Sequence, residues 1–188
     1  MKHMMKELSM HIMDITQNSV RAQAKNIEIT VTENPAENLF AFSVKDDGFG
    51  MSEELLKRVT DPFATTRTTR KVGLGIPFLR QTCEMCGGKL VLQSSEGKGT
   101  YLQASMEYDN IDRPPAGDIA SSIFLIIQMN PGIIFKYSYS YNSGSFELDM
   151  REVLEVLGGV PADTPEVSAW LKENIREEME NCRTMEGK

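Results

Sequence analysis

The chain has 188 residues, of which 20 are lysine or arginine and 27 are aspartate or glutamate, so its formal net charge is −7. This length suits one ordinary domain, or one domain with a small appendage, and it leaves no room for a membrane sensor and a coiled-coil transmitter beside a catalytic domain. An acidic chain is a poor general polyanion binder, which argues against nucleic acid as the main ligand.

Other features of the composition indicate a cytoplasmic protein without a membrane partner. The longest wholly apolar run, residues 123–127, is far shorter than the roughly 20 residues that cross a bilayer. The N-terminus has no apolar signal segment behind it, and the three cysteines are sparse and odd in number.

The first half of the chain alternates between helical and extended patterns. An apolar stripe predicts a helix over about residues 6–24. Two alternating runs then predict a hairpin, and Ser52 with two following glutamates predicts a helix start. Residues 60–72 are rich in Thr, Arg and Lys and read as a loop. The predicted hairpin pairs residues 26–32 with residues 40–45. The remaining predicted elements are a helix over 77–86 and strands over 89–94 and 100–106.

A polar stretch with two prolines, Tyr108–Asp118, predicts a boundary near Asn110. We therefore divide the chain into residues 1–109 and a small α+β module, residues 110–188. The module's predicted elements are helices over 119–129, from Asp149 and from Pro165 to about Asn181, with strands over 133–141 and 145–148. An aromatic stripe from Phe135 to Tyr141 is predicted to pack on neighbouring helices. The module could extend the sheet, cover a pocket or recruit a partner.

Four short motifs carry the candidate chemistry, although each alone has a plain structural explanation. His11, Asp14, Asn18 and Arg21 fall on one stripe of the first helix, where an amide and a carboxylate oxygen suit Mg²⁺. Asp46-Asp-Gly48-Phe-Gly50 follows a strand, and its glycines permit close approach to a ligand.

The third motif is the glycine pair Gly73-Leu74-Gly75 before a helix with an early proline, which makes an anion site. Arg67, Arg70 and Lys71 bring positive charge beside it, and no Walker motif is present. The fourth is Gly97-Lys-Gly-Thr100 between two strands. Taken singly, the first, second and fourth motifs would be explained as a solvated helix face, a turn and a hairpin, respectively.

Two residue types offer alternatives that we set aside. Cys83 and Cys86 form a Cys-x-x-Cys inside a predicted helix without a second pair, which favours core packing over a redox or zinc role. His3 and His11 are the only histidines, and neither lies in a context that suits a phospho-accepting histidine.

Together, the order and spacing of the motifs resemble the ATP-binding superfamily of gyrase, the ninety-kilodalton heat-shock chaperone, histidine kinases and MutL. The resemblance covers about residues 5–107. The run from Asp61-Pro-Phe-Ala-Thr-Thr-Arg67 to Thr100 is most similar to the histidine-kinase branch, whereas Asn18-Ser-Val-Arg-Ala-Gln-Ala-Lys is closer to MutL. It implies a two-layer α/β sandwich of the Bergerat type, with a mixed sheet covered by helices.

The resemblance also implies roles for single residues. Asn18 would ligate the Mg²⁺ that bridges the ATP phosphates, beside Arg21. Asp46 would accept the adenine amino group, with Gly48 and Gly50 close to the base. The other implied nucleotide contacts are Met51, Phe63, Gly73, Leu74, Gly75 and Thr100. Lys71 stands where the lid pattern has a glycine, so it would either stiffen the lid or place a cation near the γ-phosphate, and Arg67 and Lys71 are candidate catalytic residues. Asp14 stands where hydrolysing relatives carry a glutamate base, so it would either act as a base through a water or hold Mg²⁺-bound waters as in kinase members.

Three functions follow as hypotheses. The first is an Mg·ATP-dependent kinase that acts on a partner protein in trans. The second is an ATPase switch of the MutL and gyrase kind, whose lid closure controls dimerisation or partner binding. The third is a nucleotide-sensing module without turnover. The kinase leads because the lid and last strands match that branch, and a homodimer is left open.

Overall fold

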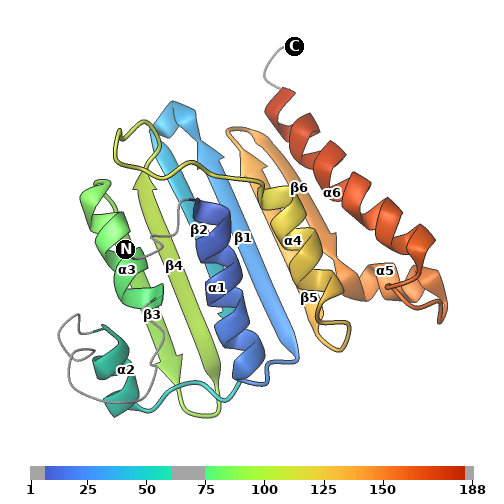
Figure 1. Cartoon of the computed structure of the whole chain (residues 1–188), viewed down its shortest axis with the longest axis horizontal. Helices are drawn as coiled ribbons and strands as arrows, with labels where there is room; N and C mark the ends of the chain where they lie inside the picture. Colours follow the sequence, from blue (N-terminus) through green and yellow to red (C-terminus); the bar gives the residue numbers. More distant parts are fainter. Residues whose placement is uncertain (1–6, 61–74, 185–188) are drawn as a thin grey trace, which may run out of the picture.

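The computed structural model describes residues 7–60 and 75–184, which form one mixed sheet with helices packed on one face (Figure 1). The sheet has six strands in the order β3-β4-β2-β1-β5-β6. In chain order the elements are α1 (Leu8–Arg21), β1 (Asn26–Asn34), the short 3-10 helix η1 (Pro35–Glu37), β2 (Leu39–Asp46), α2 (Glu53–Thr60), α3 (Gly75–Met85), β3 (Lys89–Ser95), β4 (Gly99–Glu107), α4 (Ile119–Gln128), β5 (Ile134–Tyr141), β6 (Gly144–Asp149), α5 (Met150–Leu157) and α6 (Pro165–Thr184).

The two halves of the chain meet along a parallel strand pair. β1 pairs with β2 in antiparallel register, as the sequence predicts, and its other edge pairs with β5 in parallel register from Asn26↔Ile134 to Glu33↔Tyr141. The remaining pairs are antiparallel. The second segment therefore extends the sheet through β5 and β6, which is one of the three roles left open, and the predicted mixed sheet is confirmed.

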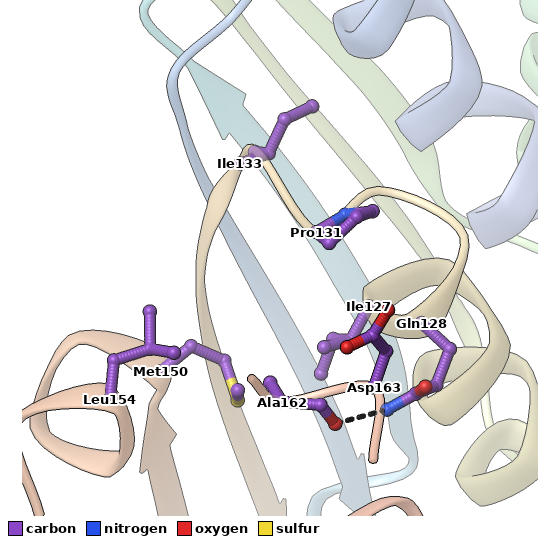
Figure 2. A pocket seen from close by; sticks show the side chains of 8 residues that line it. All are labelled: Ile127, Gln128, Pro131, Ile133, Met150, Leu154, Ala162 and Asp163. Carbon is purple, nitrogen blue, oxygen red and sulfur yellow. Dashed lines mark hydrogen bonds between the residues drawn. The ribbon is translucent and has the colours of Figure 1, made fainter. Parts of the chain in front are cut away.

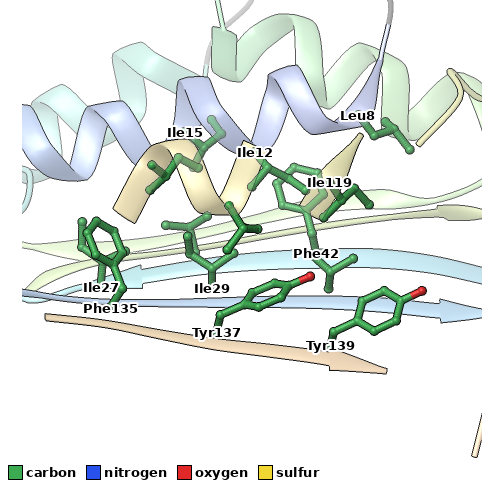
Figure 3. Close-up of a cluster of buried hydrophobic side chains, with 14 of the residues drawn as sticks. Leu8, Ile12, Ile15, Ile27, Ile29, Phe42, Ile119, Phe135, Tyr137 and Tyr139 are labelled. Atoms are coloured by element: carbon green, nitrogen blue, oxygen red, sulfur yellow. The ribbon is translucent and has the colours of Figure 1, made fainter. Parts of the chain in front are cut away.

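The core lies between the sheet and the helices and draws on both halves of the chain (Figure 3). One layer comes from α1 and α4, with Ile12, Ile15 and Ile119 buried. The strands supply the facing layer, where Phe135, Tyr137 and Tyr139 are each about 1% exposed. The aromatic stripe thus packs inward, as predicted, while Tyr141 at its end is only half-buried.

Helix α1 is shorter than the sequence predicts and its stripe of polar residues is split. The helix ends at Arg21 because Gln23 adopts a left-handed φ of 59° and the N–H of Ala24 turns back to Ser19 O. His11 is 3% exposed and belongs to the core side of the helix, so it does not share an open face with Arg21.

The predicted linker packs against the start of α1. The N–H groups of Leu8 and Ser9 donate to the carbonyls of Pro115 and Ala116, at 2.9 Å each. In the same linker, the Arg113 guanidinium lies over two aromatic rings. Its Cζ is 5.5 Å from the ring centroid of Phe40 and 4.8 Å from that of Tyr108. Among the described residues, no helix is long and apolar enough to cross a membrane.

Candidate functional site

Asp46, the last residue of β2, is a buried carboxylate held by several hydrogen bonds. Its Oδ2 accepts a 2.5 Å hydrogen bond from Ser19 Oγ on α1. Its Oδ1 accepts from the N–H groups of Gly48, at 2.9 Å, and Thr100, at 3.2 Å. The carboxylate is 8% exposed and is held by three separate segments, so its remaining lone pairs point in fixed directions.

A second hydroxyl group links the neighbouring strands. Ser94 Oγ on β3 accepts a 2.9 Å bond from Met51 N–H and donates to Gly99 O at 2.9 Å. It also lies 2.9 Å from Thr100 Oγ1. Since Ser94 has a single proton, Thr100 must be the donor in that pair when Ser94 donates to Gly99.

The loop after Asp46 threads between α1 and the β3–β4 turn. The N–H of Phe49 donates to Ala22 O, and Phe49 O accepts from Gly97 N–H at 2.8 Å. Gly50 has a φ of +65°, and a Cβ there would collide with the carbonyl of Ser95. Glycine is therefore required at Gly50 both by its dihedral angle and by the approach of a second backbone.

A cavity of about 200 Å³ opens between α1, this loop and the sheet. Its polar lining includes Asn18 and Arg21 from α1, and Arg21 Nη1 donates to Asn18 Oδ1 at 3.3 Å. Most of its other lining residues are apolar, and Phe49, which is 56% exposed, is among them. The remaining lining residues are Ile15, Ser19, Ala22, Val44, Asp46, Gly50, Met51, Val59, Ile76, Leu92, Thr100 and Leu102.

The structure brings together six of the residues predicted for nucleotide binding: Asn18, Arg21, Asp46, Gly50, Met51 and Thr100 all line the cavity. Gly48 lies behind it, where a Cβ would come within 2.6 Å of Ala22 O. Asp14 and Gly75 touch each other beside it. Phe63, Arg67, Lys71, Gly73 and Leu74 lie outside the described residues, so their assignments stay predictions.

Sequence reasoning missed the two hydroxyl groups that organise the site, Ser19 and Ser94. A signal was available for each. Ser19 continues the spacing of Leu8, Ile12 and Ile15, and Ser94 alternates with Leu90 and Leu92 on the strand. A hydroxyl on an apolar face needs a hydrogen-bond partner, because burial without one is costly.

The structure does not support a redox site at the cysteines or a metal site built from clustered His, Cys, Asp or Glu side chains within the described residues. Cys83, Cys86 and Cys182 are free and buried, and burial raises the pKa of the Cys83 thiol to about 12, so little of it is thiolate at neutral pH. Residues 7–60 and 75–184 contain no group of three or more His, Cys, Asp or Glu side chains that could hold a metal ion.

A second hollow lies at the far end of α4, next to α5 (Figure 2). It encloses only about 20 Å³, room for about one water molecule. Gln128 Nε2 donates across it to Ala162 O at 3.2 Å, and its other walls include Ile127, Pro131, Met150 and Leu154. It is therefore a packing gap and no ligand site.

Comparison with known proteins agrees with this arrangement. A family model described as "Histidine kinase-, DNA gyrase B-, and HSP90-like ATPase" matches residues 3–110, which is more than half of the chain. Sporulation kinase C of Bacillus subtilis (strain 168) is 31% identical over 97 residues, covering 52% of this chain and 22% of that kinase. Sensor histidine kinase WalK of the same organism is 31% identical over 88 residues, covering 44% of this chain and 14% of WalK.

A solved structure, the N-terminal domain of a DNA repair protein, superposes with a TM-score of 0.53 at 15% identity. The likeness covers 76% of this chain and 51% of that one, and it bears on the fold alone. The present chain spans less than a quarter of the length of either kinase named above.

Proposed function

Because the chain belongs to the histidine kinase-, DNA gyrase B- and HSP90-like ATPase family, we propose that it binds Mg·ATP in the cavity beside α1 and passes the γ-phosphoryl group to a partner protein. The observation that carries this proposal is the fixed Asp46 carboxylate, which lines the same cavity as Asn18. A carboxylate held by three donors accepts a hydrogen bond from an exocyclic amine without reorganising.

The residues of the site suit a magnesium ion that is shared with the nucleotide. Asn18 offers a hard amide oxygen to the cavity, and Asp14 lies one helical turn earlier. Mg²⁺ in phosphate-transfer sites takes one or two protein oxygens and fills its other positions with phosphates and water. When bound, it would neutralise phosphate charge, while Arg21 orients the Asn18 amide and the apolar walls exclude water.

Transfer in trans is favoured over self-phosphorylation by the position of His11. That imidazole is 3% exposed and is not among the residues that line the cavity, and His3 lies outside the described residues. The named relatives are kinases, which favours phosphoryl transfer. An ATPase switch is the second candidate, favoured by the Asp14 carboxylate one turn before Asn18, where a short acidic side chain could orient water.

A labelling experiment separates these functions. The purified chain is incubated with γ-labelled ATP, with and without cell extract, and nucleotide binding is measured in parallel. Label on a second protein is the expected result. Free phosphate without labelled protein would replace the kinase by the switch, and saturable binding with neither product would leave a nucleotide sensor.

Substitution of Asn18 tests the site itself. We expect Asn18→Ala to abolish measurable Mg·ATP binding in titration calorimetry, because it removes the only side-chain amide oxygen among the described residues that line the cavity. The melting temperature should stay close to that of the unchanged chain, since Asn18 is only half-buried. An unchanged affinity for Mg·ATP would show that the site lies elsewhere.

A further inference from the structure

Gly75, the first residue of α3, lies directly against the carboxylate of Asp14 on α1. A Cβ built on Gly75 would overlap Asp14 Oδ2 and lie 3.2 Å from Asp14 Cγ. The two helices pack against each other at this point. The acidic side chain therefore occupies the space that any other residue at position 75 would fill with its own side chain.

This contact differs in kind from those of the other glycines around the cavity. A Cβ at Gly50 would strike the backbone of Ser95, and one at Gly99 would strike the backbone of Asp46. Backbone atoms cannot move there without distorting the loop. At Gly75 the obstructing atoms are the end of a side chain with two rotatable bonds, so an alanine would displace the carboxylate and leave the helices in place.

The position of that carboxylate matters because of its neighbour. Asp14 and Asn18 are four residues apart on α1, so their side chains lie one above the other on the same face. Asn18 lines the cavity together with Ile76, the residue after Gly75. Gly75 thus lets Asp14 lie between α1 and α3 at the edge of the cavity, one turn from the amide oxygen of Asn18.

We propose that Gly75 is a positioning residue, whose missing side chain admits the Asp14 carboxylate to the place from which it holds the waters around the nucleotide's metal ion. The inference rests on the proposed Mg·ATP site and goes beyond the phosphate contact that the sequence suggested for Gly75. In this proposal Gly75 acts only through Asp14. A double substitution therefore tests it, because Gly75→Ala should have no further effect once the Asp14 carboxylate is removed.

The experiment measures how much Mg²⁺ strengthens ATP binding, as the ratio of the dissociation constants in EDTA and in Mg²⁺. The full chain, Gly75→Ala, Asp14→Ala and the double variant are compared. We expect Gly75→Ala to lower this ratio about tenfold, the lower end of the range for residues that act on a metal through its outer shell. Asp14→Ala should lower it to a similar degree, and the double variant should be no worse than Asp14→Ala.

Gly132→Ala is the matched control, since a Cβ at Gly132 has no atom within 4 Å and should leave the ratio unchanged. The inference is overturned if Gly75→Ala keeps the full ratio, if it lowers the ratio further in the Asp14→Ala background, or if the full chain binds ATP equally well without Mg²⁺. Absence of any saturable ATP binding by the full chain would instead remove the proposed function.

Discussion

One hydroxyl group, that of Ser19, supplies one of the three hydrogen bonds that orient the Asp46 carboxylate. Ser19 Oγ is the only side-chain donor to Asp46 within the described residues, and the bond is short, at 2.5 Å. A charge-assisted bond of this kind is about twice as strong as a neutral one. The orientation of the Asp46 carboxylate in the proposed site therefore depends in part on Ser19, which is itself buried.

We predict that Ser19→Ala weakens ATP binding by about tenfold, corresponding to about 1.4 kcal/mol, because Asp46 loses one of its three donors. Fluorescent-nucleotide titration measures the change. Ser138→Ala serves as control, since Ser138 Oγ reaches only Glu147 on the opposite face of the sheet. Equal affinities for Ser19→Ala and the unchanged chain would mean that Asp46 is held by the backbone donors alone.

His11 gives the protein a pH-dependent stability. Burial lowers the pKa of His11 below its ordinary value, and the nearby Asp14 carboxylate opposes this shift only in part. The folded state therefore binds fewer protons than the unfolded state below about pH 6.5. The free energy of unfolding should fall as the pH drops below that value, by at most about 1.4 kcal/mol per pH unit from this group.

Urea denaturation at pH 7.5 and pH 5.5 checks this prediction. The unchanged chain should lose more stability between the two pH values than His11→Gln, which cannot gain the proton. The variant's own stability does not enter the comparison, because only the difference between the two pH values is used. A loss of equal size in both proteins would show that carboxylates account for all of it.

At the scale of elements, a buried polar cluster links α6 to the sheet in addition to the buried apolar side chains of this helix. Glu33, at the end of β1, is 4% exposed, and its Oε1 accepts bonds of 2.8 Å from Tyr139 Oη and from Arg183 Nη2. Arg183 Nε also donates to Tyr139 Oη at 2.9 Å. Nearby, the α6 backbone at Cys182 comes so close to Gly144 that a Cβ there would lie 2.5 Å from Cys182 O.

We predict that Arg183→Ala lowers the free energy of unfolding by about 1–3 kcal/mol, because the buried Glu33 carboxylate loses its only cationic partner within the described residues. The value stays below that of a fully buried pair, since the Arg183 side chain is 38% exposed. Arg176→Ala on the same helix is the control and should change stability by less than about 0.5 kcal/mol. Similar losses in the two variants would rule out a special role for the cluster.

The elements themselves could be predicted from the sequence because their signals are local. Alternation of apolar and polar residues predicts β1 and β2. Asp149 is predicted to cap α5, and its Oδ1 accepts a hydrogen bond from the Arg151 N–H at 2.8 Å. No local signal pairs β1 with β5, since Asn26 and Ile134 are more than 100 residues apart in the chain. For the same reason the two distant donors to Asp46, Ser19 Oγ and Thr100 N–H, could not be assigned from spacing, whereas the Gly48 N–H lies only two residues away.

At the scale of the whole molecule, the two segments divided near Asn110 share one sheet and one core. Ile27 and Ile29 on β1 are buried beside Phe135 and Tyr137 on β5, so neither segment buries its apolar face without the other. The division remains a prediction about organisation along the chain. The shared core nevertheless implies that both segments unfold in one cooperative transition.

The single tryptophan, Trp170, allows cooperative unfolding to be tested at a position away from the proposed nucleotide site. Trp170 lies on α6 and is 49% exposed, whereas the proposed nucleotide site lies beside α1 and β2. A ligand that binds only the folded state stabilises it by about 2.7 kcal/mol when present at 100 times its dissociation constant. In a cooperative molecule that stabilisation must reach every element, including α6.

We therefore predict that saturating Mg·ATP raises the urea midpoint reported by Trp170 fluorescence by the same amount as the midpoint reported by far-ultraviolet circular dichroism. Asn18→Ala provides the control, since nucleotide should shift neither midpoint when it cannot bind. A Trp170 midpoint that stays constant while the circular dichroism midpoint rises would mean that residues 110–188 unfold by themselves. The parallel pairing of β1 and β5 would then contribute too little to join the two segments into one folding unit.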